Sequence, residues 1–312
     1  MGALQIKHLF GLQGVSKSDI RTILDNAKQF REILERPVKK VPSLRGMTVV
    51  NLFFENSTRT RTSFELAEKR LSADTVNFTS SNSSVKKGET LVDTLRNIES
   101  MKIDIVVVRH KGTGVPKFLA EHSNAIIVNA GDGAHEHPTQ ALLDMLTIEE
   151  KLGTLEGKNV TIIGDIRHSR VARSNLWGMS TMGAHVTLCG PSTLVPRNTG
   201  LVNLVTWEPD VKKAVANADA IIALRLQKER MDDALLPSMR EYRNTFGITE
   251  ELLECAKDKV IIMHPGPINR GVELDSDIAD GEHSVILDQV TNGVAVRMAV
   301  LFLLAGGRNE NS

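Results

Sequence analysis

The sequence contains little cysteine and no excess of either charge. Its two cysteines among 312 residues, Cys189 and Cys255, form no C-x-x-C pair. A disulfide framework or a zinc knuckle is therefore not expected, and a reducing cytoplasm is the expected location. Lys plus Arg and Asp plus Glu number 38 each, so no overall field attracts nucleic acid or an anionic membrane. Any anion-binding site must be local.

Neither a signal peptide nor a membrane span is expected from the sequence. Its N-terminal stretch MGALQIKHLFGLQG has no basic region followed by an apolar core, and Ile6 stands where N-myristoylation requires Ser or Thr. The longest late apolar run, MAVLFLLA over 298–305, is shorter than the ~20 residues that span a bilayer. We interpret this run as the buried face of a terminal helix and expect no membrane partner.

Apolar runs of strand length alternate with amphipathic stretches, which predicts α/β architecture with parallel sheets covered on both faces. In the first half the expected strands are 47–54, 74–78, 104–109 and 125–130, with helices at 16–36, 59–71, 89–101, 115–122 and 138–151. In the second half the expected strands are 159–165, 185–190, 218–224 and 259–264, with helices at 168–182 and 290–306.

The polar, glycine-containing segment 152–160 separates the two halves, and 312 residues suffice for two domains of ~100–200 residues each. We expect two doubly wound parallel-sheet domains, one over 1–150 and one over 151–289. The helix within 290–312 is expected to pack back on the first domain, because its apolar face needs a partner. Ligands of open α/β sheets bind at the carboxyl ends of the strands, so the loops there should carry the chemistry.

The strongest local signal is the corner between the first strand and its helix. The stretch STRTR at 57–61 brings three hydroxyls and two guanidinium groups to this helix start. Helix N–H groups and the positive dipole end favour an anion there, and an Arg side chain matches phosphate bidentately. Capping accounts for Ser57 and one threonine, but not for arginines that oppose the helix dipole. The motif predicts a phosphate site.

Two later loops of the first half carry similar side chains. Arg109 ends an expected buried strand, for which a solvated strand end is the alternative interpretation. In the stretch HEHPTQ at 135–140, Pro138 suits the first turn of a helix. His137 and Gln140 can then face the same side as the phosphate site.

A metal site on His135 and His137 is the competing interpretation of that stretch. Only Asp132 and Glu136 lie near these histidines, and no cysteine does. The ligand set is poor for a transition metal, so neither a metal nor another cofactor is expected.

The second half offers arginines after two of its strands. GDIRHSR at 164–170 does not match G-x-G-x-x-G, which weakens a dinucleotide site, but it supplies Arg170. LRLQKER at 224–230 supplies Arg225 and Gln227; a solvated helix start is the alternative. Two arginine loops would suit a dicarboxylate.

Two more loops complete the set of candidates. HPGPINRGVE at 264–273 contains a proline–glycine–proline turn that can bring its backbone close to a ligand. SSVKKGET at 83–90 is polar and carries Lys86 and Lys87; by itself it is typical of a surface loop.

Taken together, STRTRTSFE, the RH pair after a strand, HPTQ and HPGP resemble the carbamoyltransferase family, in its order and over nearly the whole chain. The first motif is shared by all carbamoyltransferases. The combination of HPGP with RLQKER is similar to the aspartate-specific branch, whereas ornithine carbamoyltransferases have a Cys-containing HCLP turn. The resemblance implies transfer of a carbamoyl group from carbamoyl phosphate to L-aspartate, in an active site in the cleft between the two domains.

The resemblance also implies roles for individual residues. Those assigned to carbamoyl phosphate are Ser57, Thr58, Arg59, Thr60, Ser84, Arg109, His137, Gln140, Gly266 and Pro267. Those assigned to aspartate are Lys87, Arg170, Arg225 and Gln227. Catalysis falls to Arg59, Thr60, Lys87, Arg109 and His137, with Thr60, Arg109 and His137 on the carbonyl oxygen.

Further implied roles concern closure and assembly. Glu55 and Arg230 resemble residues that hold the domains closed through ion pairs. Ser84 and Lys87 resemble residues donated by a neighbouring subunit, which implies a homotrimer with shared sites. The loop is one residue shorter than in some relatives, which leaves Lys86 as the alternative to Lys87.

Two alternatives remain open from the sequence. The acceptor could be ornithine or another amine, or the chain could be a catalytically silent metabolite-binding relative. The sequence also leaves open whether the trimer stands alone or joins regulatory chains or a dihydroorotase-like partner.

Overall fold

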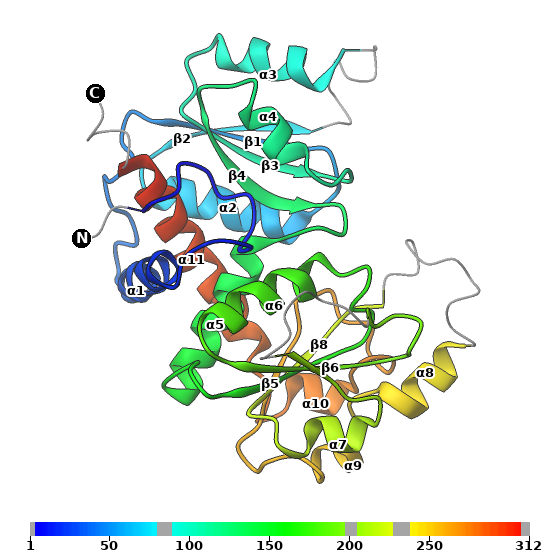
Figure 1. Cartoon of the computed structure of the whole chain (residues 1–312). Coiled ribbons are helices and arrows are strands. Elements are labelled where there is room, and N and C mark those ends of the chain that lie inside the picture. The colour runs from blue at the N-terminus through cyan, green and yellow to red at the C-terminus, as the bar shows by residue number, and fades with distance from the viewer. Residues whose placement is uncertain (1–3, 80–88, 197–204, 227–237, 307–312) are drawn as a thin grey trace. The chain divides into compact units, whose positions relative to one another are not determined.

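A computed structural model of the chain describes residues 4–79, 89–196, 205–226 and 238–306. The chain forms two compact units, each built on its own parallel sheet (Figure 1). Unit 1 comprises Met1–Leu146 and Thr291–Ser312, and unit 2 comprises Thr147–Val290. The expectation of two parallel-sheet α/β domains is confirmed.

Within the described residues, unit 1 contains a four-stranded sheet in the order β2-β1-β3-β4. Its strands are β1 (Thr48–Phe53), β2 (Asp74–Thr79), β3 (Ile105–His110) and β4 (Ile126–Asp132). Its helices are α1 (Lys17–Leu34), α2 (Thr58–Arg70), α3 (Leu91–Glu99), α4 (Val115–Ala120), the start of α5 (Pro138–Leu152) and most of α11 (Ile286–Gly306). In Figure 1, α3 and α4 lie over one face of this sheet and α2 lies over the other.

Strands β1, β3 and β4 are buried on both faces, which explains their apolar runs, whereas the edge strand β2 is partly exposed. Val50 and Leu52 of β1 pack with Leu95 of α3 and Leu119 of α4. The intervening residue, Asn51, points to the opposite face, because successive strand side chains alternate. There its amide reaches α2.

Within the described residues, unit 2 contains a five-stranded parallel sheet in the order β7-β6-β5-β8-β9. Its strands are β5 (Asn159–Ile163), β6 (His185–Cys189), β7 (Val205–Trp207), β8 (Ala220–Ala223) and β9 (Ile261–Met263). Its helices are the end of α5, α6 (Arg170–Thr181), α7 (Val211–Ala216), α8 (Met239–Phe246), α9 (Glu250–Leu253) and α10 (Ser276–Asp280). Residues of α7, α9 and α10 share one apolar core with β8 and β9.

The C-terminal helix α11 is long and apolar enough to cross a membrane by length and composition alone, and 78% of its most apolar window is buried inside the protein. The apolar run at 298–305 is part of it. It packs on unit 1, where Phe302 meets Phe30 at 5.7 Å between ring centroids. Its Arg297 lies 5.1 Å from the ring centroid of Phe64 in α2. These contacts are those of a core helix.

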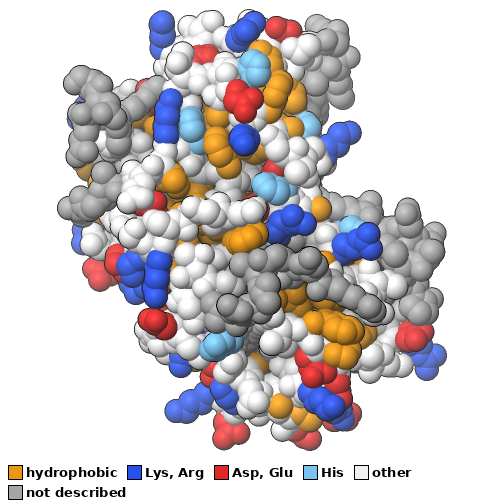
Figure 2. All heavy atoms as spheres, viewed as in Figure 1, with side chains coloured by type: hydrophobic (Ala, Val, Ile, Leu, Met, Phe, Trp, Pro, Cys, Tyr) orange, Lys and Arg blue, Asp and Glu red, His pale blue; other side chains and the backbone are white. Residues whose placement is uncertain are grey.

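Charged side chains of both signs are interspersed on the face of the molecule drawn in Figure 2. This distribution agrees with the equal numbers of acidic and basic residues in the sequence.

One buried carboxyl group lies between the sheet and α2. Glu68 is 0% exposed, and its Oε2 accepts a hydrogen bond of 2.9 Å from Asn51 Nδ2. Its other oxygen, Oε1, is buried without a hydrogen-bond partner in the part of the chain that the structure describes. Burial raises the pKa of Glu68 to about 7, and the hydrogen bond from Asn51 offsets this shift only in part. Near neutral pH, folding therefore favours the protonated form.

We predict that Glu68→Gln removes a pH-dependent loss of stability in unit 1. The folded-state pKa of Glu68 lies above the ordinary value of 4.5. The stability that the protonated carboxyl contributes is therefore complete below pH 4.5 and is lost as the pH rises toward about 7. Above neutral pH the variant should be more stable than the wild type, by about 3 kcal/mol at most.

Amide hydrogen exchange in β1 and α2 is the suitable measurement, because both tryptophans, Trp177 and Trp207, lie in unit 2. The exposed Glu121→Gln is the matched control. If amide protection in β1 and α2 falls equally in Glu68→Gln and in the wild type between pH 5 and 8, deprotonation of Glu68 does not cause the loss of stability.

Candidate active site

The order of the strands in unit 1 reverses between β1 and β3, which is the topological switch point of its sheet. From β1 the chain proceeds to β2 on one side, and from β3 to β4 on the other. Phe53 of β1 pairs with Arg109 of β3, and Phe54 N–H donates to Arg109 O at 2.9 Å. The 57–61 motif therefore follows directly beside Arg109. Open α/β sheets bind their ligands at such points.

The N-terminus of α2 gathers groups that are able to bind an anion. Ser57 is its N-cap residue, but its side chain forms no capping hydrogen bond, unlike Ser169 before α6 and Thr90 before α3. Thr58, Arg59 and Thr60 form the first turn, which contains no acidic residue. Free N–H groups, hydroxyls and a guanidinium thus gather where the helix dipole is positive.

Arg109 presents a largely buried guanidinium at the end of β3. It is 9% exposed, and its Nη1 donates to Ala130 O at 3.1 Å. Its Nη2 lies 3.7 Å from Glu55 Oε1, so Glu55 is close to Arg109 within unit 1. These contacts hold Arg109 at the carboxyl end of β3, beside the strand that leads into α2.

The neighbouring His110 has a structural role. Its Nδ1 accepts a hydrogen bond of 2.8 Å from Gly112 N–H, and its ring meets Phe54 edge-on at 5.3 Å between centroids. Burial lowers the pKa of His110, which favours the neutral ring.

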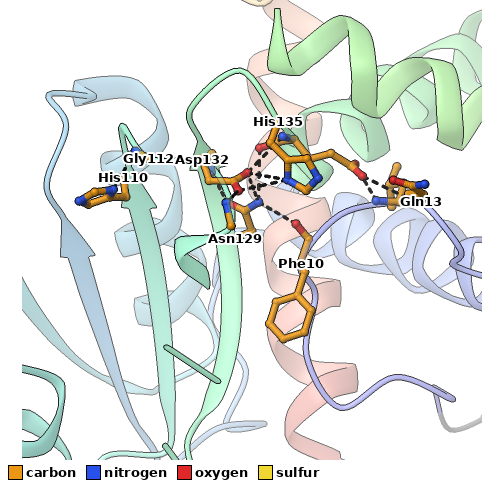
Figure 3. Close-up of polar contacts among 11 residues, drawn as sticks. Phe10, Gln13, His110, Gly112, Asn129, Asp132 and His135 are labelled. Atoms are coloured by element: carbon orange, nitrogen blue, oxygen red, sulfur yellow. Dashed lines mark hydrogen bonds and ion pairs between the residues drawn. The ribbon is translucent and has the colours of Figure 1, made fainter. Parts of the chain in front are cut away.

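The loop before α5 places His137 and Gln140, which are 4% and 8% exposed, at the start of that helix. Asp132 holds this loop, as Figure 3 shows: it accepts from Asn129 Nδ2 at 2.8 Å and lies 3.1 Å from His135 Nδ1. It also accepts from the backbone of Glu136 at 3.1 Å. Burial opposes the charge of Asp132, but the hydrogen bonds from His135, Gly114 and Asn129 outweigh it and lower its pKa.

Glu136 ties the same loop to the N-terminal segment. Its carboxylate accepts from the N–H groups of Leu12 at 2.7 Å and Gln13 at 3.2 Å (Figure 3). Gly11 is needed for this approach, since a Cβ there would lie 2.2 Å from Glu136 Oε1. Asp132 and Glu136 are thus framework residues, a role that the sequence did not predict.

Among the described residues, no group of three or more His, Cys, Asp or Glu side chains is placed to hold a metal ion. The acidic residues beside His135 and His137 are engaged in the loop framework.

In unit 2 the arginines lie at a second switch point, between β5 and β8. Arg170 begins α6 after β5 and is 5% exposed; Ser169 caps that helix by accepting from Ala172 N–H. Arg225 follows β8 and is partly buried. The two arginines therefore follow adjacent parallel strands, β5 and β8.

The Gly266–Pro267 turn follows β9, beside β8. Gly266 has φ +64°, and the Gly266–Pro267 peptide is cis. His264 supports the turn: its Nδ1 accepts from Gly266 N–H at 2.8 Å, and its Nε2 lies 3.2 Å from Glu273 Oε1. Glu273 Oε1 also accepts from Asn269 N–H at 2.6 Å. The sequence predicted the turn but not this buried His–Glu support.

The structure brings the predicted residues together in two sets. Unit 1 carries Ser57, Thr58, Arg59, Thr60, Arg109, His137 and Gln140; unit 2 carries Arg170, Arg225, Gly266 and Pro267. Ser84, Lys86, Lys87, Gln227 and Arg230 lie outside the described residues. The roles assigned to individual residues stay predictions.

Comparison with known families matches both units. Residues 7–150 match the aspartate/ornithine carbamoyltransferase carbamoyl-P binding domain, and residues 156–304 match the Asp/Orn binding domain of the same family.

Curated relatives match along almost their full length. The aspartate carbamoyltransferase catalytic subunit of Gemmatimonas aurantiaca is 60% identical over 304 residues, which cover 97% of this chain and 95% of that protein. The catalytic subunit of Cytophaga hutchinsonii is 58% identical, covering 99% of this chain and 100% of its own length.

Solved structures resemble this fold but do not separate the two acceptors. Trypanosoma cruzi aspartate transcarbamoylase in complex with carbamoyl phosphate and aspartate has a TM-score of 0.86 at 30% identity, covering 95% of each chain. Ornithine carbamoyltransferase from Pyrococcus furiosus has a TM-score of 0.87, also at 30% identity, covering 98% of this chain and 99% of that one. Two domain matches and relatives near 60% identity lead to one conclusion: the chain belongs to the aspartate/ornithine carbamoyltransferase family.

Proposed function

We propose that this protein transfers the carbamoyl group of carbamoyl phosphate to the α-amine of L-aspartate, giving N-carbamoyl-L-aspartate and phosphate, a step of de novo pyrimidine biosynthesis. The observation that carries this function is the start of α2 beside Arg109, where hydroxyls, helix N–H groups and guanidinium groups gather without an acid in the first turn. Relatives at 58–60% identity are named aspartate carbamoyltransferase catalytic subunits, which supports the choice of reaction.

In the proposed reaction, the candidate residues of unit 1, with Gly266 and Pro267 of unit 2, hold carbamoyl phosphate. Arg170 and Arg225 hold the carboxylates of aspartate. The neutral α-amine attacks the carbamoyl carbon, a C–N bond forms, and the carbonyl oxygen becomes an oxyanion. Thr60, Arg109 and His137 stabilise that oxyanion; one such donor is typically worth ~10²–10³ in rate. The C–O bond to phosphate then breaks, and phosphate leaves with the electron pair and accepts the amine proton.

Electrostatics favour aspartate over ornithine as the acceptor. The side chain of ornithine is cationic, and the guanidinium groups of Arg170 and Arg225 would repel it. Aspartate carries two carboxylates, which suit two Arg side chains on neighbouring strands.

The proposed assembly is a homotrimer in the cytoplasm, in which Ser84 and Lys87 of one subunit complete the site of the next. The two cysteines, both free thiols, fit a reducing compartment. Regulatory chains or a dihydroorotase-like partner are compatible with this assembly.

The first prediction concerns the acceptor. Incubated with carbamoyl phosphate, the protein should release phosphate with L-aspartate and not with L-ornithine, because only aspartate complements the arginines of unit 2. Mass spectrometry should identify N-carbamoyl-L-aspartate. Turnover of ornithine alone would contradict the assignment; binding of carbamoyl phosphate without turnover of any amine would indicate a silent relative.

The second prediction assigns Arg225 to aspartate alone. Arg225→Ala should raise the KM for aspartate ~10- to 100-fold, the usual effect of losing a charge-assisted hydrogen bond. The Kd of carbamoyl phosphate, measured calorimetrically, should stay within ~2-fold, because the phosphate site belongs to unit 1. Arg243→Ala is the control, since Arg243 pairs with Asp275 at the surface. Equal losses for both substrates would remove Arg225 from the aspartate site.

The third prediction tests the shared site. Lys87→Ala and Arg59→Ala chains should each retain less than ~1% of wild-type activity, because each lacks a cation assigned to catalysis. Mixed trimers should regain activity, because some interfaces combine an intact Arg59 with an intact Lys87. Native mass spectrometry verifies the mixing, and Lys86→Ala mixed in the same way distinguishes the two lysines. Verified mixed trimers as inactive as both parents would show that Lys87 does not complete a neighbour's site.

A further inference from the structure

One buried acid of unit 1, Asp144, has no place in the reaction described above. It lies on α5, is 0% exposed, and follows Gln140 by one helical turn. Gln140 Nε2 donates a hydrogen bond of 3.0 Å to Asp144 Oδ1. The contact links a carboxylate to the amide that is expected to meet the carbamoyl group.

This contact fixes the orientation of the Gln140 amide. An ionised carboxylate can only accept hydrogen bonds, so the amide must turn its NH₂ group toward Asp144. Its oxygen, Oε1, then points elsewhere and forms no hydrogen bond with the residues that the structure describes. The atom that Gln140 can offer to a ligand is therefore an acceptor.

Arg297 of α11 provides the positive charge that matches Asp144. It is 4% exposed, and its Nη1 donates to Ser63 Oγ of α2 at 2.8 Å. Burial lowers the pKa of Arg297 to about 10, while the charge of Asp144 raises it. Arg297 is thus charged at neutral pH, and the opposite charge of Asp144 supports that charge.

We propose that Asp144, matched by Arg297, is a positioning residue that locks Gln140 as an acceptor and so selects a carbamoyl group over an acyl group of similar shape. This assignment rests on the proposed function. A carbamoyl group presents N–H where an acetyl group presents a methyl group, which cannot donate. A site that must hydrogen-bond an N–H group discriminates against a ligand without it. An amide free to rotate would present either end and discriminate less.

The test compares the binding of two ligands, carbamoyl phosphate and acetyl phosphate, by calorimetry on the intact protein without aspartate. In Asp144→Asn, residue 144 can donate or accept, so the Gln140 amide is no longer fixed. The Kd of carbamoyl phosphate should rise ~10-fold, while that of acetyl phosphate should change less than ~2-fold. Equal weakening of both ligands, or no change in either, would overturn the assignment, because a merely structural role affects both alike.

A reversed pair provides the second arm. In Gln140→Glu/Asp144→Asn, residue 140 can only accept, residue 144 can donate to it, and the pair keeps one carboxylate. The ratio of the Kd of acetyl phosphate to that of carbamoyl phosphate should return to within ~3-fold of the wild-type ratio. Gln140→Glu alone places two carboxylates side by side, so its ratio should stay changed. A folded double variant that fails to discriminate would overturn the assignment.

Controls keep this result separate from that of the proposed function. Asp25→Asn makes the same change at an exposed residue of α1. This variant should prefer carbamoyl phosphate over acetyl phosphate to the same extent as the wild type. Turnover of carbamoyl phosphate with aspartate by the wild type is measured first. A wild type without turnover would contradict the proposed function but would not bear on the positioning role of Asp144. If circular dichroism shows that Asp144→Asn is unfolded, the double variant decides, because it retains the charge.

Discussion

The N-terminus of α2 is the constraint on which the site depends. A helix that begins with arginines and without acids opposes its own dipole unless an anion is present. The sheet of unit 1 places Arg109 beside this helix start, because β1 and β3 are neighbours in register. The fold thus concentrates positive charge at one edge of a protein whose net charge is zero.

Buried hydrogen bonds hold the remaining groups in place. Asp132 and Glu136 fix the loop that carries His137, and Glu136 does so by binding the backbone of the N-terminal segment. In unit 2, His264 and Glu273 support the turn at Gly266 in the same manner. Such supports restrict side-chain and loop positions before a ligand arrives, which is how a site gains precise geometry.

The sequence predicted the central strands of both sheets well, because strands buried on two faces read as continuous apolar runs. It failed where that signal is absent: β7 has only three residues, of which Trp207 is exposed, and α7 to α10 are short. The expected strand 159–165 ends at Ile163, because Gly164 adopts φ +131°.

The candidate site residues stand out in the sequence because their types are unusual at strand ends, but the residues that support them do not. Asp144, Arg297 and Glu68 look like surface charges in a helical pattern, and only tertiary packing buries them. The contact between Leu12 and Glu136 joins residues 124 positions apart, which no local pattern contains.

The most direct test of this account is the affinity of Arg59→Ala for carbamoyl phosphate, measured by calorimetry beside Arg96→Ala, an exposed arginine on α3. If the start of α2 is the phosphate site, Arg59→Ala should bind ~10- to 100-fold more weakly, as expected for a lost charge-assisted contact, and Arg96→Ala should bind as the wild type does. Unchanged affinity in Arg59→Ala, with the fold intact, would contradict it.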